Sequence, residues 1–204
     1  MGHINKLELF NSWCLLFSHP ADFTPVCSTE LGRIAVHGHE FEKRNVKILA
    51  HSVDELTSHV EWVNDIKSYC PDIHGDFPYP IIADPKRELA VKFGMFDQKD
   101  IDNPEVAKTV RALFIISPDK RVRLTMNYPQ SCGRNVDEIL RCIDSLQLTD
   151  RLKIVATPAN WIPGEKIMIL PNADPAEIKK LFPNSVDEVQ VPSGNCYIRT
   201  TTNY

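Results

Sequence analysis

Short apolar runs that alternate with segments of helical period are the feature that most restricts the fold of this chain. Five runs have the length and pattern of strands, the last two joined by a Ser-Pro-Asp-Lys turn: residues 14–17, 46–50, 80–83, 110–116 and 122–127. Apolar residues recur at helical spacing over four further segments: residues 25–41, 52–66, 86–93 and 135–146. Strands separated by such helices favour a parallel sheet, to which the hairpin adds an antiparallel strand. The sequence therefore predicts an α/β fold with a central mixed sheet flanked by helices.

After residue 150 the sequence changes character. Six prolines divide it into short segments, at positions 158, 163, 171, 175, 183 and 192. Between them, residues 166–170 have the pattern of a strand and residues 175–181 that of a helix. We therefore predict two domains, a main domain over residues 1–150 and a small C-terminal α+β domain over residues 151–204.

Charge and hydropathy exclude several classes of partner. The net charge is −4, and acidic and basic residues are mixed along the chain, so no basic patch for nucleic acid or for an anionic membrane is visible. No apolar stretch reaches the roughly 18 residues that a membrane-spanning helix needs, and the start has no signal-peptide pattern. We expect no nucleic-acid partner, no stable membrane insertion and a location in the cytoplasm, a reducing compartment.

The six cysteines have neither C-x-x-C nor any other regular spacing. Such a distribution indicates neither a zinc site nor the disulfide framework of a small secreted protein. We therefore expect no metal and no cofactor, and each cysteine is a buried, inert thiol unless its own surroundings argue otherwise.

Cys27 has such surroundings. Thr24 is suited to the N-cap of the helix that follows and Pro25 to its first position, which places Cys27 third in the helix. Backbone N–H groups there have no partner within the helix, and the helix dipole is positive, so a thiolate is stabilised. Because the thiolate is the nucleophilic form of cysteine, Cys27 is a candidate catalytic residue. From helix position alone, a cysteine that merely packs in the core is an equal alternative.

The residues around Cys27 favour the catalytic interpretation. Pro20, Thr24 and Cys27 form the pattern P-x-x-x-T-x-x-C, and the wider string FSHPADFTPVCSTE resembles peroxiredoxins of the 1-Cys group, the peroxiredoxin-6-like subfamily of the thioredoxin-fold peroxidases. The resemblance continues through SVDELTSHVEWVNDI, VRALFIISPDK and ATPANWIPGEKIMILP, and so covers nearly the whole chain. It implies a thioredoxin-like fold, a homodimer, and reduction of hydrogen peroxide and organic hydroperoxides through a cysteine sulfenic acid.

The same resemblance implies roles for individual residues. Cys27 is the peroxidatic residue, Thr24 and Pro20 shape its pocket, and Arg111 is the catalytic arginine. Arg111 also begins a strongly apolar strand, where a full charge is costly unless an anion such as a thiolate meets it. An arginine that extends to water or pairs with a carboxylate is the alternative. The hydroxyl of Thr24 either holds the peroxide or caps the helix, and the sequence does not separate these uses.

Two further residues have open roles. His19 lies beside the pocket, where it either hydrogen-bonds the thiol or serves a structural purpose. Arg134 matches an arginine near the pocket in the family, with a surface ion pair as the alternative.

The remaining cysteines indicate how Cys27 is reduced again. Two-cysteine relatives carry a resolving cysteine, commonly within a V-C-P motif, which is missing here. We therefore expect an external thiol as reductant, and the family suggests glutathione. Cys14 and Cys142 lie among apolar positions, which predicts that they are buried. Cys70, Cys132 and Cys196 remain alternative resolving partners of Cys27.

Two alternative functions differ in class from a peroxidase. Some 1-Cys relatives hydrolyse phospholipids through a G-x-S-x-G motif, but here Ser12 lacks both glycines, Lys6 stands where the family's histidine would fall, and only Asp119 is in register. The other alternative is a thioredoxin-fold interaction or holdase-like protein that has lost activity. This alternative applies if the chain lacks the start of the family's fold, which carries an L-G-D-x-x-P-x-F pattern. Loss of that segment would expose core surface or a sheet edge.

Overall fold

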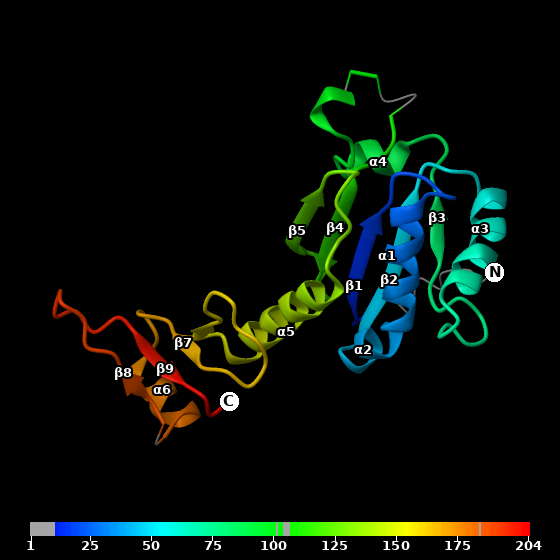
Figure 1. Ribbon diagram of the computed structural model, residues 1–204. Helices are drawn as coiled ribbons and strands as arrows, with labels where there is room; N and C mark the ends of the chain where they lie inside the picture. The colour runs from blue at the N-terminus through cyan, green and yellow to red at the C-terminus, as the bar shows by residue number, and fades with distance from the viewer. Residues whose placement is uncertain (1–10, 101, 104–106, 184) are drawn as a thin grey trace. The chain divides into compact units, whose positions relative to one another are not determined.

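The computed structural model describes residues 11–100, 102–103, 107–183 and 185–204 (Figure 1). It divides into two compact units, Met1–Val136 and Asp137–Tyr204. The boundary expected from sequence, after residue 150, stays a prediction. No helix within the described part of the chain is both long and apolar enough to cross a bilayer.

A five-stranded mixed sheet forms the centre of the first unit. Its strand order is β3-β2-β1-β4-β5, with parallel pairing among the first three strands and antiparallel pairing of β1 with β4 and of β4 with β5. The strands are β1 (Trp13–Ser18), β2 (Val46–Ser52), β3 (Ile81–Ala83), β4 (Arg111–Ile116) and β5 (Val122–Tyr128). Each lies on one of the five runs expected from sequence. The thioredoxin-like fold class is confirmed.

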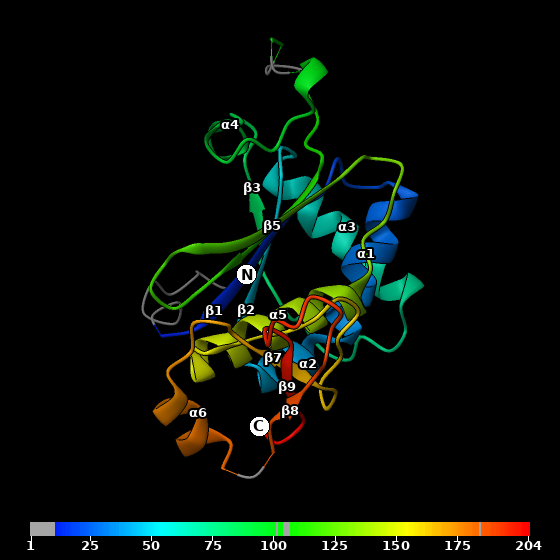
Figure 2. The ribbon, with the colours of Figure 1, turned by 90° about the vertical axis from the view of Figure 1, so that its left-hand side faces the viewer.

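Helices cover both faces of this sheet. They are α1 (Pro25–Val36), α2 (Gly38–Lys43), α3 (Leu56–Tyr69), α4 (Glu88–Lys92) and a 3-10 turn at Gln98–Asp100. Figure 2 shows α1 and α3 together on one side of the sheet, with α4 on the other. Because side chains alternate along a strand, Ala112 and Phe114 of β4 join the apolar cluster around Ala90 of α4, whereas Arg111 and Leu113 project to the side of α1.

Several helix boundaries differ from the sequence-based expectation, and two of these differences have a clear local cause. The predicted helix over residues 25–41 is interrupted at His37, whose N–H and ring both bond to the Arg33 carbonyl and end α1. The segment expected to be helical from residue 52 is not helical at its start, because Ser52 ends β2 and its hydroxyl donates to Asp54 at 2.7 Å. Helix α3 starts later, after Glu55.

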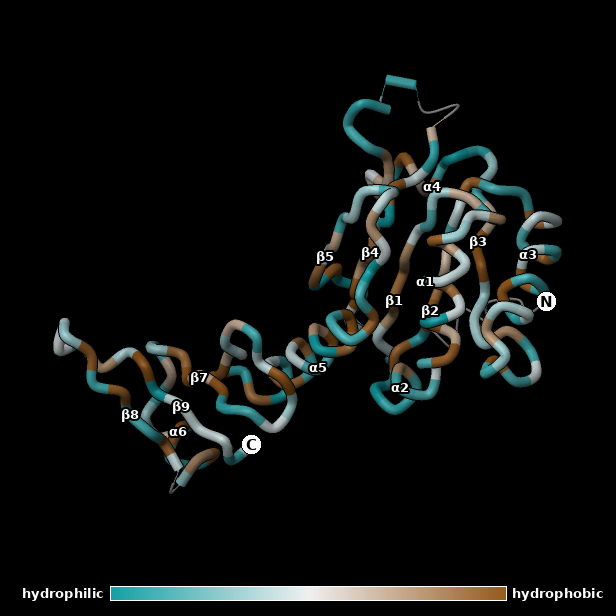
Figure 3. The backbone as a smooth tube through the Cα atoms, in the orientation of Figure 1, coloured by the Kyte–Doolittle hydropathy of each residue, from teal (hydrophilic) through white to brown (hydrophobic). Residues whose placement is uncertain are grey.

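The second unit is small and contains most of α5 (Val136–Leu152) together with α6 (Pro175–Leu181). Its four strands are antiparallel in the order β6-β7-β9-β8: β6 (Val155–Ala156), β7 (Ile167–Ile169), β8 (Asp187–Glu188) and β9 (Arg199–Thr201). Asp174 caps α6 by accepting a hydrogen bond from the Ala176 N–H at 3.0 Å. Apolar side chains that include Trp161 and Ile167 form its core. Figure 3 colours β7 as a hydrophobic segment of the chain.

Gly32 permits close contact between α1 and the end of α3. A Cβ atom at Gly32 would lie 2.3 Å from Sγ of Cys70, the residue that ends α3, which is closer than non-bonded atoms approach. A side chain at this position would therefore force the cysteine or the helix to move.

Gly32→Ala should destabilise the protein by roughly 1–3 kcal/mol, because overpacking a close contact costs this much. In a Cys70→Ala background the sulfur is absent, so the same change should cost less or stabilise, since alanine favours a helix by about 1 kcal/mol over glycine. Chemical denaturation of the four proteins measures the coupling. Gly38→Ala is the matched control, because its Cβ would meet Pro78 at an ordinary 3.8 Å. Equal costs of Gly32→Ala in both backgrounds would contradict the contact.

Candidate active site

Cys27 lies in the first turn of α1, at the position expected from sequence. Thr24 precedes the helix with an extended backbone, Pro25 occupies its first position, and the first intrahelical hydrogen bond runs from the Ser28 N–H to the Thr24 carbonyl at 3.0 Å. The side chain of Thr24 does not cap the helix but donates to the Ala21 carbonyl at 2.8 Å. The N–H groups of the first turn are thus not occupied by this hydroxyl and can face an anion.

Arg111 reaches the sulfur of Cys27. Its Nη1 atom lies 3.3 Å from Sγ, and both side chains are buried. Its Nε and Nη2 atoms donate to the Gln130 carbonyl at 3.0 and 2.6 Å. The guanidinium is therefore held at two edges and does not extend to water, whereas the alternative of pairing with a carboxylate is met, because Nη1 also donates to Glu30 at 2.7 Å.

Glu30 joins this arginine to a second one. Its Oε2 accepts from Nη1 of Arg111 at 2.7 Å and from Nη2 of Arg134 at 2.9 Å, and its Oε1 accepts from Nε and the backbone N–H of Arg134, each at 2.8 Å. Burial raises the pKa of the Glu30 carboxyl, but the two guanidiniums outweigh this effect and lower the pKa below its ordinary value. Glu30 is ionised at neutral pH.

Arg134 is buried rather than part of a surface ion pair. Its side chain is 1% exposed, its Nη1 donates to the Ala112 carbonyl at 2.9 Å, and its guanidinium lies over the Phe17 ring at 4.9 Å. Sequence reasoning missed Glu30, although a glutamate three residues after the candidate nucleophile, beside the core positions of α1, was a readable signal.

His19 and Pro20 begin the loop between β1 and α1, and both are buried. The backbone of His19 donates to the His51 carbonyl at 3.0 Å and its carbonyl accepts from Thr109 Oγ1 at 2.7 Å. The ring Nε2 donates to Asp22 at 2.8 Å. Burial lowers the pKa of His19 more than Asp22 raises it, which keeps the imidazole neutral.

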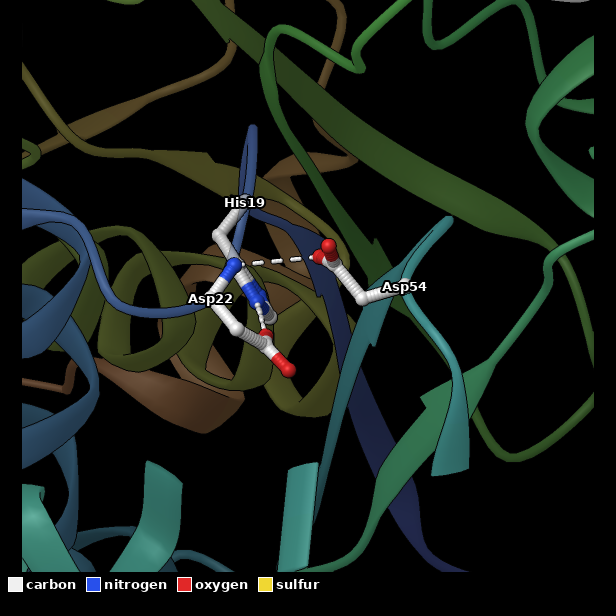
Figure 4. Close-up of side chains that lie close together, drawn as sticks. All are labelled: His19, Asp22 and Asp54. Atoms are coloured by element: carbon white, nitrogen blue, oxygen red, sulfur yellow. Dashed lines mark hydrogen bonds and ion pairs between the residues drawn. The ribbon is translucent and has the colours of Figure 1, made fainter. Parts of the chain in front are cut away.

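Asp22 and Asp54 surround the His19 ring with groups whose spacing would suit a metal ion (Figure 4). Their oxygens, however, already accept hydrogen bonds. Asp22 accepts from His19, from Ser58 Oγ at 2.7 Å and from His59 Nδ1 at 2.6 Å. Oδ2 of Asp54 accepts from the Asp22 N–H at 3.0 Å. This arrangement is that of a hydrogen-bonded anchor, and no ion is needed to explain it.

The other cysteines differ in accessibility, and all six are free thiols. Burial raises the pKa of Cys14 to about 11, and burial with a hydrogen bond to Glu138 raises that of Cys142 to about 11, so both are poor nucleophiles. Cys132 and Cys196 are exposed, and Cys70 is half-buried.

Ser12 lacks the partners that a hydrolase would need. Its hydroxyl donates to Asn45 Oδ1 at 3.2 Å, and Asp119 accepts from Ser117 instead. Lys6 lies outside the described residues. The geometry gives no support to a lipid hydrolase.

Comparison with known families places the chain. Residues 2–125 match the AhpC/TSA family, and residues 145–184 match the C-terminal domain of 1-Cys peroxiredoxin. The chain is 50% identical to Peroxiredoxin-6 of Gallus gallus over 194 residues, which cover 95% of this chain and 86% of that protein. It is 48% identical to Peroxiredoxin-6 of Homo sapiens with the same coverage.

Solved structures agree. A cysteine-to-serine variant of Peroxiredoxin 6 of Arenicola marina matches with a TM-score of 0.89 at 51% identity, over 96% of this chain and 88% of that chain. The yeast mitochondrial 1-Cys peroxiredoxin matches with a TM-score of 0.82 at 42% identity, over 95% and 87% of the two chains.

A thioredoxin-like sheet with a buried cysteine at a helix start, facing an arginine, defines a thiol-dependent peroxidase. The chain belongs to the AhpC/TSA family and, within it, to the 1-Cys peroxiredoxins. It is an antioxidant oxidoreductase that acts on peroxides.

Glu30→Gln should lower the free energy of unfolding by about 3 kcal/mol at neutral pH, because removing one member of a buried ionic group leaves a charge uncompensated. Since folding lowers the pKa of Glu30, its contribution is complete above the ordinary glutamate pKa of about 4.3 and is lost as the pH falls through the folded-state value. Denaturation of both proteins across acid and neutral pH measures the difference. A difference that does not shrink in acid would contradict this role.

Proposed function

We propose that the chain reduces hydrogen peroxide and organic hydroperoxides at Cys27, with Arg111 as the residue that stabilises charge during the reaction. The observation that carries this assignment is the 3.3 Å contact between Nη1 of Arg111 and Sγ of Cys27, inside a buried site. A guanidinium fixed by Glu30 and the Gln130 carbonyl is already in place before substrate arrives.

The reaction follows from this arrangement. The Cys27 thiolate attacks one peroxide oxygen, the S–O bond forms, and the O–O bond breaks. The departing oxygen takes the electron pair and then a proton, which yields water or an alcohol. Sulfur is oxidised to the sulfenic acid while the peroxide is reduced. Arg111 and the N–H groups of the first turn of α1 stabilise the negative charge as it moves from the sulfur to the departing oxygen.

We assign Thr24 and Pro20 to the walls of the pocket. Thr24 Oγ1 uses its proton on the Ala21 carbonyl, which leaves oxygen lone pairs to accept the hydroxyl hydrogen of a hydroperoxide. Pro20 is buried beside His19 and lacks an N–H that would compete for the thiolate. In this proposal His19 supports the loop, and Arg134 holds Glu30 in place.

The sulfenic acid is returned to the thiol by an external thiol, and we propose glutathione as that reductant. For the yeast mitochondrial 1-Cys peroxiredoxin, thiol resolution proceeds via the glutathione and thioredoxin systems. A first thiol condenses with the sulfenic acid to a mixed disulfide and water, and a second thiol releases Cys27.

We also propose a cytoplasmic homodimer in which the peroxidase domain spans residues 1–150 and the C-terminal domain residues 151–204. Among the described residues β5 pairs only with β4, and much of it is exposed, so its free edge suits pairing with a second copy. Six unpaired cysteines fit a reducing compartment. The alternative of an inactive, holdase-like protein is not favoured by the relatives or by the intact contact between Cys27 and Arg111.

Cys27→Ser should abolish peroxide reduction while the fold is retained, because a serine hydroxyl is not ionised at neutral pH and cannot replace the thiolate. Stopped-flow mixing with hydrogen peroxide measures the first oxidation step, and thermal unfolding checks the fold. Cys132→Ser is the matched control, since that exposed thiol should not affect the first step. Substantial turnover by Cys27→Ser would refute the assignment.

Excess peroxide without a reducing thiol should inactivate the enzyme by converting Cys27 to sulfinic and then sulfonic acid. A sulfenic acid that awaits an external thiol is open to a second peroxide, so glutathione added first should protect. Mass spectrometry of the Cys27 peptide, compared with residual activity, measures the competition. If the peptide instead carries a disulfide to another cysteine of this chain, the external-thiol mechanism is wrong.

A further inference from the structure

Asp22 is a buried, charged residue that lies between Pro20 and Thr24 in the sequence. The peroxidase reaction makes no direct use of it. It is 6% exposed and lies in the loop that enters α1. Its carboxylate binds neighbours in the loop and in α3, and Figure 4 shows it beside the His19 ring.

The carboxylate of Asp22 connects two elements. Its Oδ1 accepts from Nε2 of His19, within the loop, and its Oδ2 accepts from His59 and Ser58, both in the first turns of α3. Despite burial, these three hydrogen bonds lower the pKa of Asp22, so the acceptor stays ionised. One side chain thus ties the loop to α3.

A further bond fixes the backbone of the same residue. The Asp22 N–H donates to Oδ2 of Asp54 at 3.0 Å, and Asp54 is held by the hydroxyl of Ser52, the last residue of β2. The loop is therefore attached to the sheet and to α3 through one residue. Both attachments lie within the first unit.

The loop needs this attachment because its next residue is strained. Phe23 has φ +51°, in the left-handed region, and its side chain is 53% exposed, so little packing holds it there. A non-glycine residue keeps such a conformation only where its surroundings over-determine it. Thr24 follows directly, and its backbone begins α1.

Given the proposed function of Cys27, we propose that Asp22 is the positioning residue of the peroxide pocket, which holds Pro20 and Thr24 in place by binding His19 and His59 at the same time. It does not touch the peroxide. Its loss would leave the thiolate and Arg111 intact but would let the walls of the pocket shift, and a displacement of about 1 Å can cost roughly a hundredfold in rate.

Asp22→Asn tests this proposal, because asparagine has the same shape but no charge and replaces one of the two acceptor oxygens by an NH2 group, which then faces a side chain that is itself a donor. We expect the rate of Cys27 oxidation by hydrogen peroxide to fall roughly ten- to a hundredfold. Alkylation of Cys27 by iodoacetamide requires the thiolate but no peroxide alignment, so its rate and its pH profile should be unchanged or its rate slightly higher. Ser58→Ala is the control, since it removes one of three donors and leaves the charge and both imidazoles.

A second pair of variants decides the matter if Asp22→Asn does not fold. His59→Leu removes the donor from α3 and should slow peroxide oxidation but not alkylation. His59→Asn retains an N–H near Nδ1 and should restore the rate. An Asp22→Asn or His59→Leu protein that is oxidised as fast as the unaltered protein, or that loses peroxide and alkylation rates in equal proportion, would overturn the proposal. An unaltered protein whose Cys27 is not oxidised by peroxide would instead refute the proposed function.

Discussion

The ionic group of Arg111, Glu30 and Arg134 is the interaction on which the site depends. Two guanidiniums and one carboxylate leave a net charge of +2 − 1 = +1, buried beside Cys27. A buried net charge is costly unless an opposite charge meets it, and a thiolate at Cys27 supplies that charge at a distance of 3.3 Å. The charge balance of this group therefore suits an anion at the position that the Cys27 sulfur occupies. The same group joins α1, β4 and the segment before α5.

Strand alternation explains why one arginine can serve both the core and the site. Leu113 and Ile115 share a face of β4 with Arg111 and are fully buried. A slip of the strand by one residue would move Ala112 and Phe114 out of the apolar cluster around Ala90 and onto the opposite face of the sheet. The register of β4 against β1 thus fixes the position of the guanidinium. Packing energy, spread over the sheet, determines the geometry of a single polar contact.

Much of this architecture could be predicted from sequence, and the exceptions share a cause. The strands and Cys27, Arg111 and Pro25 follow from local patterns, since apolar runs and helix-start residues act over a few positions. Glu30 offered a local signal, three residues after Cys27, but neither its partner nor that of Asp22 could be identified from local patterns, because Arg134 and His59 are 104 and 37 residues away. A buried carboxylate becomes meaningful only when the fold brings its donors to it. The start of the helix expected from residue 52 was wrong for a related reason, because Ser52 extends β2 and pairs with Ala83 of β3.

Complete burial of the Cys27 side chain imposes a final condition on the catalytic cycle. Hydrogen peroxide is small, whereas the proposed tripeptide reductant is much larger, so we expect that reductant to reach a buried sulfenic acid only after residues around Cys27 move. The loop before α1 is held by the hydrogen bonds that join Asp22 to His59 and to Asp54, and it contains the left-handed Phe23. These hydrogen bonds order the pocket for the oxidation of Cys27 by peroxide. Because they are few, they can break one at a time without unfolding the sheet. Arg111 and Glu30 lie instead on β4 and α1, so moving them would disturb the pairing of the sheet or the helix. Opening is therefore expected on the loop side, where the external thiol would enter.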